Sequence, residues 1–222
     1  MRTIVFDLDG TLIDTAPDLI ATLNLIVTRE GLQPVPYDVA RSMIGGGARI
    51  MIEKALAAEG REVSKPELDR MFEAFIAHYA DHIADRSRPF PYLECTLDGL
   101  AEAGYRLAVC TNKLEGLSVR LLDALDLSRR FAAICGQDTF GMQKPDPRVL
   151  QLTIERAGGS ADRAIMIGDS GTDIRVSRAA GVPVIAVDFG YSEAPIESLS
   201  PDRIISSFAE LPEAIAEIEA GV

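Results

Sequence analysis

Two carboxylates, Asp7 and Asp9, stand near the start of the chain and are followed at once by Gly10. Residues 3–6 before them are β-branched or aromatic, which predicts a short buried strand. In a strand the two aspartates would share a face, and like charges so close are costly unless a cation lies between them or one carries a proton. The pair therefore offers a nucleophile that also binds a metal, and a second carboxylate that carries protons. A plain turn is the alternative, because Asp-Gly pairs are common in hairpins.

Two later segments carry groups that suit phosphate. A second predicted strand ends in Thr111 and Asn112, which offer a hydroxyl and backbone N–H groups for phosphate oxygens, or merely cap the next helix. Lys144 precedes two prolines, Pro145 and Pro147, which preset the backbone around it. A lysine fixed in this way suits the charge of a transferring phosphoryl group, and an exposed loop lysine is the alternative.

The acidic residues Asp169 and Asp173 follow another predicted strand and have small neighbours. Mg²⁺ favours one or two carboxylates together with water and substrate phosphate. Asp7, Asp9 and Asp169 could supply such a site between them. The two later aspartates could also cap the following helix, and Asp173 could do both.

Short apolar runs predict the strands that would position these groups. They occupy residues 3–6, 106–111, 132–136, 164–169, 183–188 and 203–205. Helical patterns lie between them at residues 96–103, 117–125, 147–157 and 172–180. This alternation predicts an α/β fold with a doubly wound, Rossmann-like parallel sheet, whose ligands bind beyond the carboxyl ends of the strands.

Residues 15–86 break the alternation, because they show helical patterns and no convincing strand. The helical patterns fall at residues 17–29, 48–58 and 66–84. Ser64 and Glu67 form a capping-box signal before the last of them. The sequence therefore predicts an α/β core of residues 1–14 and 87–222 and a helical insert of residues 15–86.

Composition narrows the classes of protein and partner. The chain is 47% hydrophobic and 25% charged, as expected of a globular protein, and its net charge of −12 disfavours nucleic acid as a partner. No apolar run long enough for a membrane span and no signal segment is seen, which predicts a cytoplasmic protein without a membrane partner. The three cysteines, Cys95, Cys110 and Cys135, are predicted to be reduced thiols in the core.

In their order along the chain, the four motifs resemble the haloacid dehalogenase superfamily, with an α-helical cap inserted after the first motif. The opening run FDLDGTLIDTAPDL, the glycine-rich residues 45–49 and the Thr-Asn-Lys run at 111–113 most resemble phosphoglycolate phosphatases. The resemblance implies that Asp7 attacks phosphorus. It also implies that Asp9 first protonates the leaving oxygen and then activates water.

The same resemblance implies the remaining site residues of the core. Thr111 and Lys144 would hold the phosphoryl oxygens, with Asn112 beside them as a further substrate-binding residue. Mg²⁺ would be bound by the Asp7 carboxylate, the Asp9 backbone carbonyl and Asp169. Asp173 would lie nearby, either as a ligand or behind the ligands.

In the helical insert, Gly46, Gly47 and Arg49 stand at the predicted start of a helix. There the backbone N–H groups and one guanidinium could meet an anionic leaving group. A plain turn followed by a surface arginine is the alternative. We take the three residues as candidates for substrate binding.

The function expected from this reading is a magnesium-dependent phosphatase. It would hydrolyse a small phosphomonoester, 2-phosphoglycolate first of all, through an aspartyl-phosphate, as a monomer or homodimer. A phosphatase for another small metabolite is one alternative, and a phosphohexomutase resembling β-phosphoglucomutase is another, because it would share all four motifs. A dehalogenase would need neither Asp9 nor a magnesium site, and a silent phosphate-binding module would not need the full set of charged residues.

Overall fold

A parallel six-stranded sheet forms the centre of the computed structural model, which describes residues 2–221. Its strands are β1 (Thr3–Phe6), β4 (Arg106–Cys110), β5 (Ala133–Cys135), β6 (Ala164–Gly168), β7 (Val184–Val187) and β8 (Arg203–Ile205). The order across the sheet is β5-β4-β1-β6-β7-β8, and each pair of neighbours is parallel. The predicted α/β class with a parallel sheet is confirmed.

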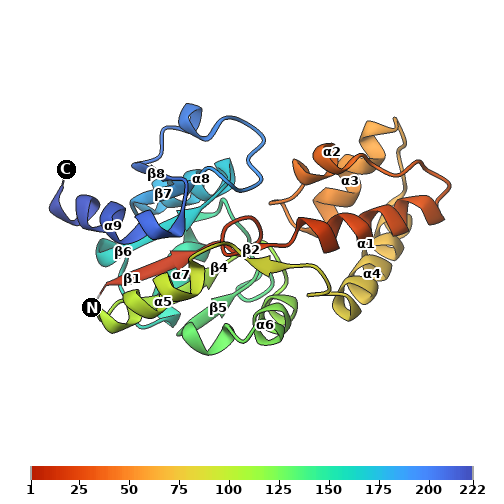
Figure 1. The fold of residues 1–222 in the computed structure, drawn as a ribbon. Helices are drawn as coiled ribbons and strands as arrows, with labels where there is room; N and C mark the ends of the chain where they lie inside the picture. Colours follow the sequence, from red (N-terminus) through yellow and green to blue (C-terminus); the bar gives the residue numbers. More distant parts are fainter. Residues whose placement is uncertain (1, 222) are drawn as a thin grey trace.

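Helices cover both faces of the sheet (Figure 1). Ile4 and Phe6 of β1 pack on one face and Val5 on the other, because successive side chains of a strand point to opposite sides. The first face is covered by α5 (Leu93–Glu102), α6 (Glu115–Ala124) and α9 (Leu211–Ala220). The second face is covered by α7 (Pro147–Arg156) and α8 (Gly171–Ala180). Burial on both faces explains why these strands are almost wholly apolar.

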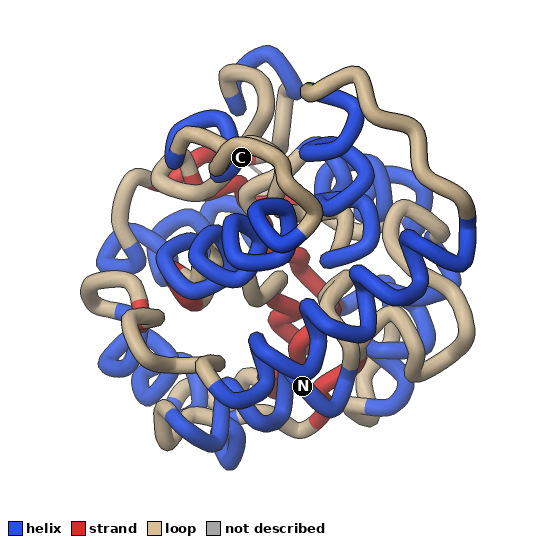
Figure 2. The backbone as a smooth tube through the Cα atoms, turned by 90° about the vertical axis from the view of Figure 1, so that its right-hand side faces the viewer, coloured by secondary structure: helices blue, strands red, loops and turns tan. Residues whose placement is uncertain are grey.

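The helical insert lies to one side of the sheet (Figure 1), and Figure 2 shows it in front of the strands. Its helices are α1 (Ala16–Arg29), α2 (Tyr37–Arg41), α3 (Ala48–Ala58) and α4 (Lys65–Asp81). The short helix α2 was not predicted, because within its five residues only Ala40 is buried and no helical period is visible. Two short strands, β2 (Ile13–Asp14) and β3 (Arg88–Pro89), pair antiparallel where the chain leaves the core and returns to it.

Local contacts begin and end several helices, including the predicted capping box before α4. Asp146 caps α7 by accepting a hydrogen bond from the backbone N–H of Arg148 at 3.0 Å. Glu67 accepts a hydrogen bond from the backbone N–H of Ser64 at 2.9 Å before α4. Gly181 ends α8 in the left-handed conformation. These contacts satisfy backbone groups that a helix end leaves without partners.

Short 3₁₀ helices complete the loops of the core at Ser128–Arg130, Ala161–Arg163, Ile196–Leu199 and Phe208–Glu210. Across residues 2–221, every helix is too short or too polar to cross a membrane.

The cysteines differ from the prediction in one case. Cys110 and Cys135 are free thiols buried in β4 and β5, as predicted. Cys95 is also free but lies exposed on α5, so its prediction as a core residue was wrong. Helix α5 packs against the sheet through Leu93 and Leu97, and the helical period places Cys95 between them on the outer side.

Candidate active site

The predicted site residues follow four strands that are neighbours in the sheet, β5, β4, β1 and β6. Asp7 follows β1, Thr111 follows β4, Lys144 follows β5 and Asp169 follows β6. Because the strands are parallel, their carboxyl ends meet at one edge of the sheet. Segments that are far apart in the sequence therefore place their polar side chains together.

Lys144 is the buried cation of this site, with only 2% of its surface exposed. Its Nζ lies 2.9 Å from Oδ1 of Asp7 and 2.7 Å from Oδ1 of Asp173. Burial alone would lower the pKa of Lys144, but the charges of Asp173 and Asp7 outweigh it and raise that pKa. Lys144 therefore stays positively charged beside the predicted nucleophile.

Three buried carboxylates, those of Asp7, Asp169 and Asp173, offer oxygens that all lie within 4.8 Å of one another. Burial raises the pKa values of Asp7 and Asp169, and the charge of Asp173 raises them further. Lys144 supplies one positive charge against three acidic groups. Hard oxygen donors with an excess of negative charge suit a divalent cation, so the residues present fit a metal site.

Asp169 is held in a fixed orientation by two hydrogen bonds. The Thr11 hydroxyl donates to its Oδ1 at 2.9 Å, and the backbone N–H of Tyr191 donates to its Oδ2 at 2.6 Å. Gly10 passes directly beside it with φ of +85°, and a Cβ on Gly10 would lie 2.5 Å from Oδ2 of Asp169. The glycine after the two aspartates is therefore required both by its backbone conformation and by this close approach.

Asp173 caps a helix and also binds Lys144. Its Oδ2 accepts hydrogen bonds from the backbone N–H of Ser170 at 3.1 Å and from the Ser170 hydroxyl at 2.6 Å, which caps α8. Its Oδ1 remains for Lys144. The cap of α8 thus fixes the carboxylate that holds the buried lysine.

The carboxylate of Asp9 pairs with a different lysine from the one that pairs with Asp7. Lys113 donates to both carboxylate oxygens of Asp9 at 2.9 Å each. Lys113 is buried at the site, with 7% of its surface exposed. The Nζ of Lys113 also lies 4.6 Å from the ring centre of Tyr79, which comes from α4 in the helical insert.

Thr111 and Asn112 lie between these two ion pairs. The Thr111 hydroxyl accepts a hydrogen bond from the backbone N–H of Lys113 at 3.2 Å. The Asn112 side chain bonds the backbone of Lys144 through Oδ1 at 2.9 Å and through Nδ2 at 3.2 Å. Its Nδ2 also lies 3.3 Å from the carbonyl oxygen of Gly45. Asn112 therefore positions Lys144, and its predicted contact with substrate remains a prediction.

A cavity of about 40 Å³ lies between the strand ends and the helical insert. Asp7, Asp9 and Thr111 line it from the core. Met51 of α3 and Phe75 of α4 line it from the insert, together with other apolar side chains. The cavity thus has a charged side that belongs to the core and a largely apolar side that belongs to the insert.

The glycine-rich segment of the insert is divided between two surroundings. Gly47 lines the cavity with φ of +88°, and a Cβ there would lie 2.9 Å from the carbonyl oxygen of Asn112. Gly46 lines a separate, more polar hollow next to Ser170 and Thr172. Gly47 therefore lets α3 begin in close contact with the core.

Arg49 does not itself line the cavity, although it stacks on Phe72, which does. Its guanidinium lies 2.7 Å from the Asp69 carboxylate and 4.7 Å from the ring centre of Phe72. The Arg49 side chain is 38% exposed. In this conformation it has the surroundings of a surface arginine. Its contact with substrate stays a prediction that this arrangement does not favour.

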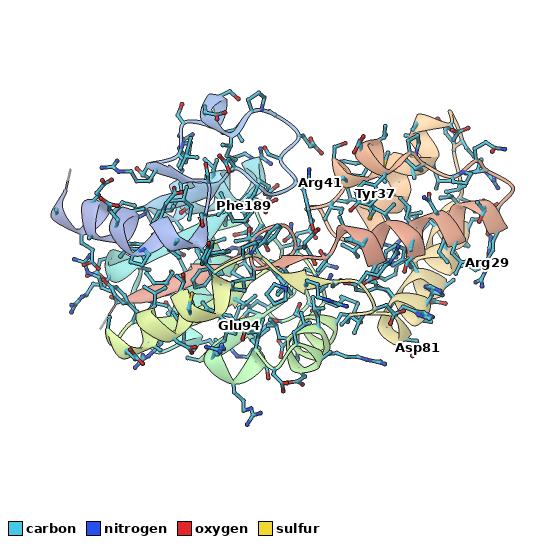
Figure 3. The ribbon with its side chains drawn as sticks, in the orientation of Figure 1. Arg29, Tyr37, Arg41, Asp81, Glu94 and Phe189 are labelled. Atoms are coloured by element: carbon cyan, nitrogen blue, oxygen red, sulfur yellow. The ribbon has the colours of Figure 1, made fainter. Side chains whose placement is uncertain are left out.

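The insert is also fastened to the core beside Asp169. Arg41 of α2 donates hydrogen bonds to the carbonyl oxygens of Phe189 at 2.9 Å (Figure 3) and Gly190 at 2.8 Å. Its guanidinium also lies 5.0 Å from the ring centre of Tyr191. The Tyr191 hydroxyl in turn lies 2.6 Å from Oδ1 of Asp14. Burial and Asp14 raise the pKa of Tyr191, so it stays a neutral donor.

Several residues of the site were not predicted from the sequence. Thr11 could have been noted, because it stands two residues after Asp9. Tyr191, Arg41 and Tyr79 lie in loops or helices whose approach to the site depends on the complete fold. Their sequence positions show nothing that distinguishes them from ordinary packing residues.

Comparison with known proteins agrees with this geometry. Residues 4–187 match the family model described as haloacid dehalogenase-like hydrolase. A phosphoglycolate phosphatase of Mesorhizobium japonicum is 50% identical over 96% of this chain and 94% of its own length. One of Agrobacterium fabrum is 49% identical over 96% of this chain and 91% of its own length.

Solved structures show the same likeness. A predicted phosphoglycolate phosphatase from Haemophilus somnus superimposes with a TM-score of 0.89 at 28% identity, over 96% of this chain and 97% of its own. A putative phosphoglycolate phosphatase from Lactobacillus delbrueckii superimposes with a TM-score of 0.88 at 26% identity, over 97% of this chain and 99% of its own. The resemblance seen in the motifs is thereby confirmed, and the chain belongs to the haloacid dehalogenase-like hydrolase family.

Proposed function

We propose that this protein is a magnesium-dependent phosphatase that hydrolyses 2-phosphoglycolate to glycolate and phosphate. The observation that carries the proposal is the buried Lys144, bound between Asp173 and Asp7, the second of which lines a small cavity. Such a group fits a transferring phosphoryl group, whose charge needs fixed cations. The names of relatives at up to 50% identity support the substrate.

The chain's own residues account for two chemical steps. An oxygen of Asp7 attacks phosphorus while the bond to the leaving oxygen breaks, and Asp9 donates a proton to that oxygen. Asp9 then takes a proton from a water molecule, whose oxygen attacks phosphorus and releases Asp7. Lys144 and Thr111 hold the phosphoryl oxygens. Bound at Asp7, Asp169 and the Asp9 carbonyl, with Asp173 adjacent, Mg²⁺ would neutralise the phosphoryl charge.

In this proposal residues 15–86 act as a cap over a catalytic core of residues 1–14 and 87–222. The insert closes the cavity with apolar side chains, which exclude bulk water from the reacting groups. Contacts such as those of Arg41 hold it against the core. A cytoplasmic location and a monomeric or dimeric state stay predictions of the sequence.

The small size of the cavity supports a small ester over the rival hexose phosphates. About 40 Å³ leaves room for about three water-sized groups. Both esters need α3 and α4 to move away from the strand ends, and a hexose phosphate needs the larger movement. This favours the phosphatase over a phosphohexomutase, although both would use the same aspartates.

The test is phosphate release by the purified protein from 2-phosphoglycolate, glycerol phosphate and glucose 6-phosphate, with Mg²⁺ and with a chelator. We expect the highest kcat/KM for 2-phosphoglycolate and loss of release on chelation. Preference for another ester would refute the substrate and retain the phosphatase. Isomerisation of β-glucose 1-phosphate without phosphate release would replace the proposal by the mutase.

A further inference from the structure

Lys113 is the residue that fixes the carboxylate of Asp9. Among residues 2–221, it is Lys113 alone that donates hydrogen bonds to this carboxylate, with 2.9 Å to each oxygen. By contrast, the carboxylate of Asp7 is held both by Lys144 and by the backbone N–H of Leu8 at 2.7 Å. The orientation of Asp9 toward the cavity therefore depends on one side chain.

Tyr79 of the insert covers this ion pair. Its ring centre lies 4.6 Å from Nζ of Lys113, and the ring is buried with 1% exposed. An aromatic ring replaces the water that a lysine ammonium would otherwise bind, and attracts its charge. Near the C-terminal end of α4, Asp81 lies 3.5 Å from Arg120 of α6 in the core.

These contacts form a chain from the core to the insert, in the order Asp9, Lys113 and Tyr79. We propose that Lys113 is a positioning residue for Asp9, and that Tyr79 makes this positioning depend on α4 lying against the core. The inference rests on the proposed function, in which Asp9 transfers protons. With α4 away, water would reach Lys113 and Asp9, and the carboxylate would gain rotational freedom. Proton transfer is then efficient only when the cavity is closed.

A different role for Lys113 would be to bind a negative charge on the leaving group. The geometry favours positioning, because two of its contacts go to Asp9 and another side faces the ring of Tyr79. The two roles also predict different kinetics. Loss of positioning lowers kcat for every ester, whereas loss of a leaving-group contact raises KM only for esters that carry a carboxylate.

The test compares Lys113→Met with the wild-type protein on three esters. These are 2-phosphoglycolate, 2-hydroxyethyl phosphate, whose leaving group is a neutral alcohol, and p-nitrophenyl phosphate, whose leaving group departs as a stable anion. We expect kcat to fall about 10²-fold for the first two, as for a misplaced catalytic group, with KM changed less than about threefold. For the third, kcat should also fall, because the same aspartyl-phosphate is hydrolysed by water that Asp9 activates, but kcat/KM should fall less, because the first step needs little protonation of this leaving group.

Matched variants separate this role from a general loss of structure. Lys65→Met removes a lysine on α4 whose side chain is 86% exposed, and should leave all rates unchanged. Lys113→Arg restores a cation that can bond both oxygens of Asp9, and should recover at least about tenfold of the lost kcat. Tyr79→Leu leaves the ion pair intact and should lower kcat by about tenfold, as expected of a less well positioned group. Circular dichroism and the melting temperature show whether each variant is folded.

Two results would overturn the inference. One is a rise in KM confined to 2-phosphoglycolate with kcat unchanged, which would make Lys113 a leaving-group residue. The other is full activity of a folded Lys113→Met protein. If the wild type prefers another ester, the proposal of 2-phosphoglycolate as substrate is refuted. The ratios of kcat and KM between variant and wild type on that ester still decide the role of Lys113. Absence of phosphate release from every ester would overturn both proposals.

Discussion

The two sides of the cavity are built on different principles. The core side presents charged groups such as Asp7, Asp9 and Lys113, and each of them is held by an ion pair with a neighbouring side chain. The insert side consists mainly of apolar groups such as Met51 and Phe75. Charges that are fixed before substrate arrives suit the reaction, which is the same for any phosphate ester. Apolar walls select the leaving group of the ester only by its size and shape.

The largest effect should follow from a change on the core side. Asp7→Asn keeps the size of the side chain but removes the nucleophile and one negative charge. We expect kcat for phosphate release to fall more than about 10³-fold, with an unchanged circular dichroism spectrum. Asp126→Asn, at an exposed position after α6, is the matched control and should keep full activity. Substantial turnover by the Asp7→Asn variant would disprove the role of Asp7 as nucleophile.

A buried charge in the insert should behave differently, since Asp18 of α1 serves structure. It accepts hydrogen bonds from the backbone N–H of Arg86 at 2.9 Å, and from the backbone N–H and hydroxyl of Ser87 at 2.8 and 2.7 Å. We expect Asp18→Asn to cost about 2 kcal/mol of unfolding free energy, measured with denaturant, while kcat stays within about threefold. A loss of kcat without loss of stability would contradict this division.

The stability that Asp18 contributes should also depend on pH. Burial alone would raise the pKa of Asp18, but the hydrogen bonds from Ser87 and Arg86 lower it below its usual value. A carboxyl group with a lowered pKa in the folded protein stabilises the fold at neutral pH, and this contribution is lost as the pH falls through that pKa. The difference in stability between wild type and Asp18→Asn should therefore shrink below about pH 4.

A smaller effect is expected from the wall of the cavity. Ile76→Ala enlarges the cavity from the insert side. The ratio of kcat/KM for glycerol phosphate to that for 2-phosphoglycolate should rise about tenfold, because a few methylene groups give discrimination of this size. Ile204→Ala, on exposed β8 surface, removes the same atoms and should leave the ratio unchanged. An equal loss of activity on both esters would mean that Ile76 supports the fold rather than selects the substrate.

The smallest effect should come from Arg49→Gln. Arg49 is bound to Asp69 and lies outside the cavity lining, so we expect kcat and KM for 2-phosphoglycolate to change less than about threefold. A rise in KM well beyond that range would show that Arg49 turns into the cavity when substrate binds. The insert would then supply charge as well as shape, and the contrast between the two sides would weaken.

The sequence predicted the core well because its strands are buried on both faces. Runs such as residues 164–168 are apolar throughout, and the polar residues at their ends mark the edge of the sheet where ligands bind. The sequence therefore predicted a single site that contains Asp7, Lys144 and Asp169. Asp173 could be assigned two tasks because a capping residue and a metal neighbour need the same position.

The sequence could not predict contacts between distant segments. Asp9 and Lys113 are separated by 104 residues, and their ion pair depends on β1 and β4 being neighbours. Tyr79 looked like any aromatic residue of a helix, since only the angle of α4 brings it to Lys113. Arg49 was a plausible ligand on charge alone, and Asp69 holds it elsewhere.

The antiparallel pair of β2 and β3 has a consequence for chain connectivity. Asp14 and Arg88 lie opposite each other, so the intervening segment departs from the core and rejoins it at neighbouring points. The segment between β2 and β3 is therefore a loop whose ends are held together at the core. The entropic cost of closing such a loop grows only slowly with the length of the loop. A segment of another length or shape could replace it without altering the register of the parallel sheet. Shape selection and phosphoryl chemistry can thus change independently along one chain.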